Sequence, residues 1–167
     1  MKGRRMSLSR LQALAWTFLV IAAYLNAFIV NIAGDVKDPL NVAIPGELLI
    51  AMGISVGSLA GAKIVLAVKE NNNPPESGSA VYKSSSPRWR DLFQGDTRES
   101  AGSLDLGKIQ MFYITIALVL GYAIVVATKF VGVQPGQGID TLPNLDQAFV
   151  ALLAISHAGY LTTKAAS

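Results

Sequence analysis

The sequence holds one histidine, His157, and no cysteine, so the side chains that most often carry nucleophilic, metal-binding or redox chemistry are scarce. An imidazole inside a membrane could relay protons or gate a pathway, or it could be held by an interhelical hydrogen bond. We expect no Asp or Glu at its depth to orient it as in a hydrolytic triad. A single histidine without cysteine does not make a zinc site either. The sequence therefore predicts no catalytic residue, no metal site and no cofactor, and a protein that is not an enzyme.

A second candidate for chemistry is "GISVGSLAGAK", in which Gly53, Gly57 and Gly61 stand at every fourth position before Lys63. A phosphate-binding loop requires G-x-x-x-x-G-K-[ST], but this lysine follows alanine and precedes isoleucine. Small residues four apart instead allow two membrane helices to approach closely. We predict a helix-packing seam, whose partner is either the last helix of the same chain or the equivalent helix of a second copy.

Four apolar runs must position these residues, at about 11–33, 46–68, 109–130 and 144–163. Each is roughly 20 residues long, the length that an α-helix needs to cross about 30 Å of hydrocarbon. A soluble bundle would show a polar helix face, which "LQALAWTFLVIAAYLNAFIV" lacks. A cleaved signal peptide would have a shorter apolar core and a small-residue cleavage site. The expected fold class is therefore all-α and transmembrane, with four helices.

The net charge of +3 indicates topology and not nucleic-acid binding. Lysines and arginines are concentrated in residues 1–10 and 69–107, whereas only Lys37 and Lys129 remain for the other side. The positive-inside rule then places both termini and the central segment in the cytoplasm. The basic residues are expected to meet anionic headgroups of the bilayer.

The two halves of the chain form an internal repeat. "SRLQALAWTFLVIAAY" (9–24) aligns with "GKIQMFYITIALVLGY" (107–122), and this alignment matches Gln12 with Gln110. The glutamines are expected either to hydrogen-bond to a neighbouring helix or to line a polar vestibule in an oligomer. Because each half crosses the membrane twice, the halves are parallel repeats, built as two tandem helical hairpins.

The seam recurs in the second half, where "AISHAGYLTTK" aligns with "GISVGSLAGAK". Ala154 and Ala158 occupy the positions of the first two glycines, and Lys164 occupies that of Lys63. We expect both lysines to extend their ammonium groups to the headgroups. His157 has no counterpart, because valine stands at the equivalent position.

The central segment 69–107 is rich in Asn, Pro, Ser and Gly and is expected to be largely flexible. Within it, "PRWRDLF" (87–93) places Trp89, Leu92 and Phe93 at helical spacing beside two arginines. These three residues are candidates for contact with the membrane surface or a cytoplasmic protein partner. The alternative is a disordered loop whose aromatic residues have no role.

The predicted organisation is a basic cytoplasmic N-terminus (1–10), a transmembrane hairpin (11–68), the linker (69–107) and a second hairpin (108–167). "SLSRLQALAWT", "IPGELLIAMGISVGSLAG", "LDLGKIQMF" and "AISHAGYLTTK" resemble segments of a group of uncharacterised multi-pass bacterial membrane proteins. The resemblance implies a location in the bacterial inner membrane and implies no active-site residues.

Two functions are compatible with this organisation. The first is a non-enzymatic scaffold or accessory subunit, which assembles through the small-residue seam as a homo-oligomer or within a membrane complex. The alternative is a homo-oligomeric ion channel or pore, in which Gln12, Gln110 and His157 would face the pathway.

Overall fold

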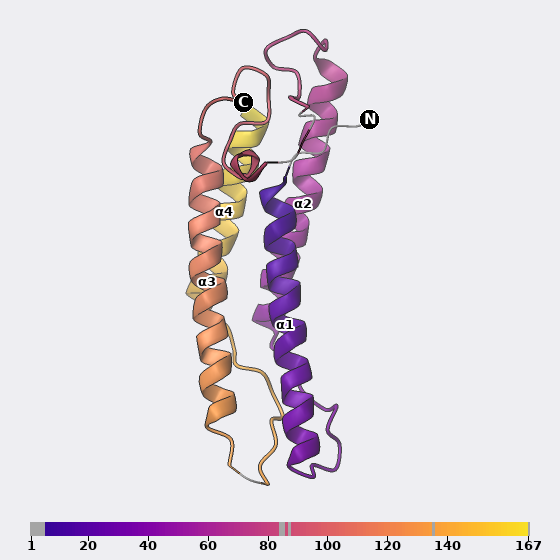
Figure 1. Cartoon of the computed structure of the whole chain (residues 1–167), viewed down its shortest axis with the longest axis vertical. Helices are drawn as coiled ribbons and strands as arrows, with labels where there is room; N and C mark the ends of the chain where they lie inside the picture. Colours follow the sequence, from indigo (N-terminus) through magenta and orange to yellow (C-terminus); the bar gives the residue numbers. More distant parts are fainter. Residues whose placement is uncertain (1–5, 84–85, 87, 135, 167) are drawn as a thin grey trace.

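The computed structural model describes residues 6–83, 86, 88–134 and 136–166. The described residues form four α-helices, α1 (Leu8–Ala33), α2 (Gly46–Asn72), α3 (Leu106–Val131) and α4 (Gln147–Ala166). They lie side by side in one elongated bundle, with the start of α1 and the end of α4 at the same end of the bundle (Figure 1). The predicted all-α class with four helices is confirmed. The basic residues 1–5 of the predicted N-terminal segment, and Pro87 of "PRWRDLF", lie outside the described residues.

Helices α1 and α2 pack as one hairpin, and α3 and α4 pack as another. Each hairpin then contacts the other through α2 with α4 and through α1 with α3. Since α2 and α4 are each the second helix of a hairpin, they run in the same direction, away from the loops (Figure 1). Proline and glycine residues mark several helix ends. Pro45 precedes the first residue of α2, and Gly34 and Gly132 follow the last residues of α1 and α3.

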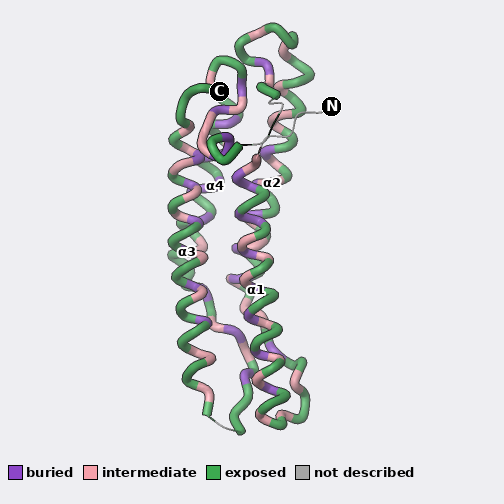
Figure 2. Tube along the Cα trace, in the orientation of Figure 1, coloured by how far each residue is buried: buried purple, intermediate pink, exposed green. Residues whose placement is uncertain are grey.

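Exposed residues recur along each of the four helices (Figure 2), and many of them are large and apolar. Helices α1, α2 and α3 are long and apolar enough to cross a membrane. Helix α4, with 20 residues, is not in that group. It contains the polar residues His157, Tyr160 and Lys164. Exposed large apolar side chains include Leu14, Phe18, Ile21, Ile29, Ile64, Leu120, Ile124 and Ile155.

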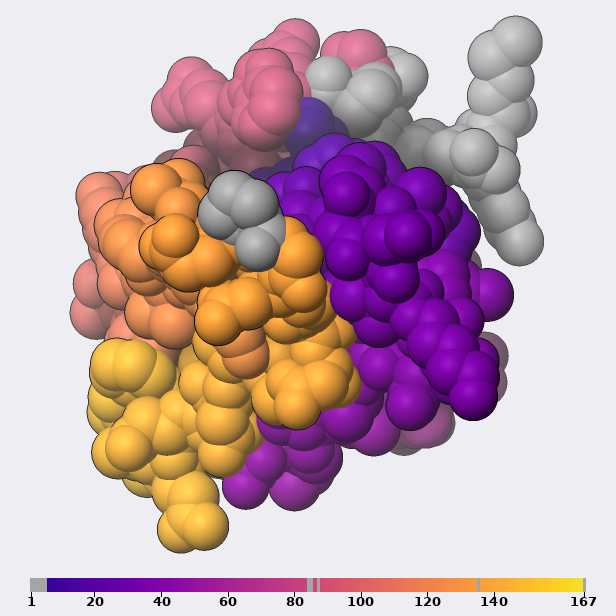
Figure 3. Space-filling model, turned by 90° about the horizontal axis from the view of Figure 1, so that it is seen from below, coloured from indigo at the N-terminus to yellow at the C-terminus, as the bar shows by residue number. Residues whose placement is uncertain are grey.

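Two loops close the end of the bundle that lies away from the termini. The loop after α1 and the loop after α3 meet in a short parallel pairing between Ala43 and Thr141. Viewed from this end, the two loops lie against each other (Figure 3). A side chain at Gly138 would place its Cβ 2.6 Å from Val36 Cγ2, so a larger residue there would require the Val36 side chain to shift.

The buried side chain of Asn31 joins these two loops. Its Nδ2 donates to the carbonyl oxygens of Pro39 at 3.1 Å and Ile139 at 2.9 Å, and its Oδ1 accepts from the Ile139 N–H at 2.6 Å. Asn31 therefore pairs three backbone groups that would otherwise be buried without partners.

We predict that Asn31→Ala lowers the free energy of unfolding by about 3 kcal/mol, because the loss of one side chain leaves several buried polar groups unpaired. Thermal unfolding of the purified protein in detergent measures this effect. The matched control is Asn41→Ala, at an exposed asparagine of the same end. Equal melting temperatures for the two variants would contradict the role given to Asn31.

Candidate functional site

The segment between α2 and α3, residues 73–105, folds over the end of the bundle that carries the termini, and we call it the cap. Its described residues contain a short 3-10 helix, Trp89–Leu92, and two isolated antiparallel bridges, Val81 with Thr97 and Gln94 with Leu104. Leu92 is buried in an apolar cluster with residues of all four helices, namely Leu8, Ala62, Met111 and Tyr160. The sequence predicts a largely flexible linker here, and this stays a prediction. In the structure, the described residues of the segment share the apolar core of the helix ends.

The carboxylate of Asp96 in the cap lies between two buried lysines. The Lys108 ammonium, in the first turn of α3, donates to Asp96 Oδ1 at 2.9 Å and to the Gln94 carbonyl at 2.6 Å. The Lys164 ammonium, in the last turn of α4, pairs with Asp96 Oδ2 and lies 5.3 Å from the centre of the Tyr160 ring. Both lysine side chains are only 4% exposed. We call Asp96, Lys108 and Lys164 the ionic triad.

The triad keeps Asp96 ionised. Burial alone would raise the pKa of this carboxyl, but the charges and hydrogen bonds of Lys164 and Lys108 outweigh that effect and lower the pKa below its ordinary value. Asp96 is therefore negatively charged at neutral pH and offsets part of the positive charge of the two buried lysines.

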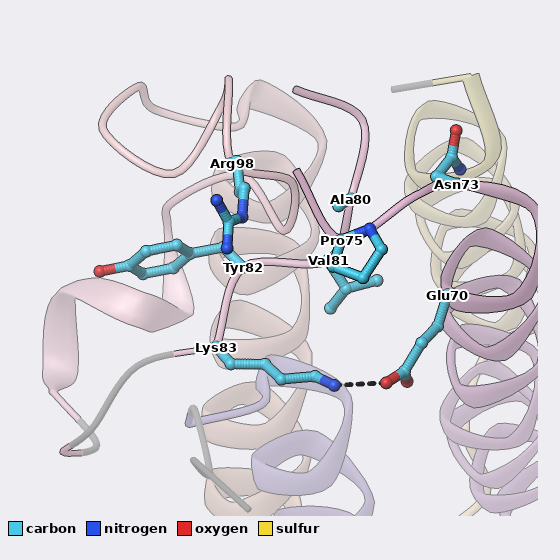
Figure 4. A pocket seen from close by; sticks show the side chains of 8 residues that line it. All are labelled: Glu70, Asn73, Pro75, Ala80, Val81, Tyr82, Lys83 and Arg98. Atoms are coloured by element: carbon cyan, nitrogen blue, oxygen red, sulfur yellow. Dashed lines mark hydrogen bonds and ion pairs between the residues drawn. The ribbon is translucent and has the colours of Figure 1, made fainter. Parts of the chain in front are cut away.

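A pocket of about 400 Å³ lies beside the triad, between the cap, α1, α2 and α4, and we call it the cap pocket. A second pocket of about 510 Å³ adjoins it and shares Glu70, Val81, Tyr82 and Lys83. Figure 4 shows the second pocket, with the ion pair between Lys83 of the cap and Glu70 of α2 at its edge. The cap pocket is lined by Met6, Ser7, Leu8, Arg10, Leu59, Ala62, Lys63, Leu66, Glu70, Val81, Tyr82, Lys83, Asp96, Lys108, Tyr160 and Lys164.

Further along the bundle, every helix contributes buried polar side chains between two apolar clusters. On α4, for example, Ser156 and His157 lie between Tyr160, in the cluster below the cap, and Leu153, in the central cluster. The same order holds on the other three helices. We call this set the polar layer, and it consists of Ser9, Gln12, Ser55, Ser58, Thr115, Ser156 and His157.

Hydrogen bonds within the polar layer link α1 to α3. The Gln12 side-chain amide donates to Thr115 Oγ1 at 2.8 Å and to the Met111 carbonyl at 3.1 Å. Among the described residues, no hydrogen-bond partner is found for either ring nitrogen of His157, for Gln12 Oε1, or for the hydroxyls of Ser9, Ser55, Ser58 and Ser156. This layer therefore places several donors and acceptors that have no partner among the described residues in the interior of the bundle.

The predicted seam residues lie mostly on the outside of the bundle. Gly53, Gly57, Ala154 and Ala158 are exposed, and a Cβ added at either of these glycines would point into open space. Gly61 alone approaches α4, where an added Cβ would lie 3.2 Å from the Leu161 side chain. Of the two partners left open by the sequence, α4 of the same chain therefore does not cover Gly53 or Gly57. A seam with a second copy stays a prediction.

The three residues predicted to face one pathway do not share a side. Gln12 and His157 are buried in the interior, whereas Gln110 is exposed on the outer surface of α3. The two glutamines align in sequence, but on α3 the neighbouring residue Met111 is buried in place of Gln110.

The three residues singled out in "PRWRDLF" also separate. Trp89 is 71% exposed, whereas Leu92 is buried and the Phe93 ring packs edge-on against Phe112 at 5.0 Å. Leu92 and Phe93 thus contact the bundle of their own chain, which leaves Trp89 as the member accessible to a partner or a membrane surface.

The ionic triad was not predicted from the sequence. Lys164 was expected to reach the headgroups like Lys63, with which it aligns in sequence, but it is buried against Asp96 while Lys63 is exposed. Asp96 stands in "QGDT", which reads as an ordinary polar turn. The only available signal was the recurrence of a lysine at the end of an apolar helix.

Comparison of the chain with protein-family models, curated proteins and solved structures finds no match.

We predict that Asp96→Asn releases the cap, because it leaves two buried ammonium groups without their shared carboxylate, at a cost of about 3 kcal/mol. Trypsin cleavage within the cap, at Lys83, Arg88, Arg90 and Arg98, should then accelerate roughly 100-fold. Asp140→Asn, at an exposed aspartate of the opposite end, is the control and should leave cleavage unchanged. An unaltered cleavage rate in Asp96→Asn would mean that the triad does not hold the cap.

Proposed function

We propose that the chain is a non-enzymatic, multi-pass protein of the bacterial inner membrane that acts as a scaffold or accessory subunit. The large apolar side chains exposed on the outer faces of the helices support membrane insertion, since a soluble bundle would place polar side chains there. In this proposal α4 crosses as well, because its 20 residues span about 30 Å.

The two hairpins are proposed to be parallel repeats. Equivalent tyrosines of the first helices both donate to loop carbonyls, Tyr24 to Leu40 at 2.7 Å and Tyr122 to Pro143 at 2.9 Å. The paired loop residues Ala43 and Thr141 stand 98 positions apart, the same offset that aligns the first helices. The offset of the Ala43 and Thr141 pair supports a duplication, with a pseudo-twofold axis along the membrane normal.

The proposed orientation places the cap and both termini in the cytoplasm. The cap and the adjoining helix ends hold most of the basic residues, whereas the opposite loops and helix ends hold Lys37 and Lys129. This asymmetry is the pattern that the positive-inside rule associates with the cytoplasmic face. A cytoplasmic protein partner would meet Trp89 on the outer side of the cap.

The observation that carries the assembly role is the exposed small-residue face of α2 and α4. Gly61 meets Leu161 where these two helices touch, and the exposed Gly57 and Ala158 stand within one helical turn of that contact. A shallow strip of this kind lets the backbone of another helix approach closely, which is how helices associate in lipid. We propose that the strip is covered by the same strip of a second copy, giving a homo-oligomer.

We predict that Gly57→Leu shifts the protein from oligomer to monomer, because four added heavy atoms keep the two backbones apart. The oligomeric state is measured in nanodiscs by mass photometry. Gly121→Leu, at an exposed glycine of α3 with equal open space, should leave the state unchanged. A wild-type protein that is strictly monomeric, or an equal effect of both variants, would contradict assembly through this strip.

A second candidate function, an ion or proton channel, is favoured by the polar layer. Unpaired donors and acceptors from several helices, with Gln12 and His157 among them, would suit a hydrated pathway inside the bundle. Gln110, on the outside, has no part in this version of the channel.

If the polar layer conducts, the purified protein should pass protons or monovalent cations across liposomes, and His157→Ala should change the rate or its pH dependence. Gln110→Ala is the matched control and should conduct like the wild type. Liposomes that remain impermeable to several ions would contradict the channel and leave the scaffold proposal.

A further inference from the structure

We propose that the cap pocket binds a phosphate group, carried by an anionic phospholipid or by a soluble phosphate compound. This inference rests on the proposed membrane location, because the pocket lies where the apolar helices meet the polar cap. Nothing in the assembly or channel proposals uses this pocket.

The charges of the pocket favour an anion. Its described lining contains five cationic side chains, Arg10, Lys63, Lys83, Lys108 and Lys164, against the carboxylates of Glu70 and Asp96. Both carboxylates are already engaged by lysines, Glu70 by Lys83 and Asp96 by the triad. The positive excess is therefore local to the pocket, and a bound anion would offset it in a partly desolvated place.

Arg10 and Lys63 are the cations best placed to receive the ligand. Both are exposed, they come from adjacent helices, and the described residues provide no ion-pair partner for either. Arginine offers a planar fork of donors that matches phosphate oxygens, and lysine adds a mobile ammonium group. Together they can hold a phosphate from two sides of the pocket opening.

The shape of the pocket suits a ligand that is longer than a free ion. On α2 the lining follows one stripe from Leu59 through Ala62, Lys63 and Leu66 to Glu70, which spans about 16 Å at 1.5 Å per residue. Leu59, at the end away from the cap, is apolar, whereas the cap end is charged. A phospholipid likewise has an apolar part joined to a charged headgroup. Basic pockets between helices near the cytoplasmic surface are typical headgroup sites.

The test measures binding to the full-length protein in detergent by native mass spectrometry, with phosphatidylglycerol, phosphatidylcholine and inorganic phosphate as separate probes. We expect phosphatidylglycerol to bind at least tenfold more tightly than phosphatidylcholine. The double variant Arg10→Gln with Lys63→Gln should lose at least tenfold in this affinity. The control double variant, Lys37→Gln with Arg90→Gln, removes the same two charges from exposed positions outside the pocket and should bind like the wild type.

The arms distinguish the two sources of the phosphate. Binding of inorganic phosphate that the pocket variant abolishes, without any preference among lipids, would assign the pocket to a soluble phosphate compound. Absence of binding by every probe, or equal binding by the two double variants, would overturn the proposal. Alkaline carbonate extraction of the wild type is scored separately: release from the membrane contradicts the membrane location, whereas retention without phosphate binding contradicts the pocket alone.

Discussion

One carboxylate, that of Asp96, joins three parts of the chain that are distant in sequence. It accepts from Lys108 at the start of α3 and from Lys164 at the end of α4, and it belongs to the cap that follows α2. Two ammonium groups buried to this degree would cost several kcal/mol each without it. The position of the cap, the burial of Leu92 among the helix ends and the shape of the cap pocket all depend on this shared ion pair.

The opposite end of the bundle depends on hydrogen bonds instead of charge. There Asn31 forms hydrogen bonds with backbone groups of both loops. The two hairpins also pack against each other along the helices between the loops and the cap. Between these ends the interior is partly polar and the outside is apolar. In water this arrangement would be costly, whereas in a bilayer it places the apolar faces in hydrocarbon and keeps polar groups within protein. The proposed assembly through the small-residue strip and the proposed conduction through the polar layer both require a bilayer.

The helices were predictable because apolar runs of membrane-spanning length have few other uses. The side of the bundle on which the glycines lie, the burial of Lys164 and the fold of the cap were not predictable, for different reasons. The four-residue spacing of Gly53 and Gly57 shows that they share a helix side, but spacing does not tell which side faces the bundle. Lys63 and Lys164 align in sequence, yet Lys164 is buried against the Asp96 carboxylate whereas Lys63 is exposed. That carboxylate comes from the cap, whose composition resembles a flexible linker because its apolar partners belong to the helices.

The central claim is that four helices cross the membrane and keep the cap on one side and the loops on the other. Because the chain has no cysteine, this topology can be tested with single-cysteine variants and a membrane-impermeant thiol reagent. Lys37→Cys marks an exposed loop position, and Glu76→Cys marks an exposed cap position. The account predicts that the reagent added from the periplasmic side labels Lys37→Cys at once and labels Glu76→Cys only after the membrane is lysed. Labelling of both variants from the same side of an intact membrane would contradict it.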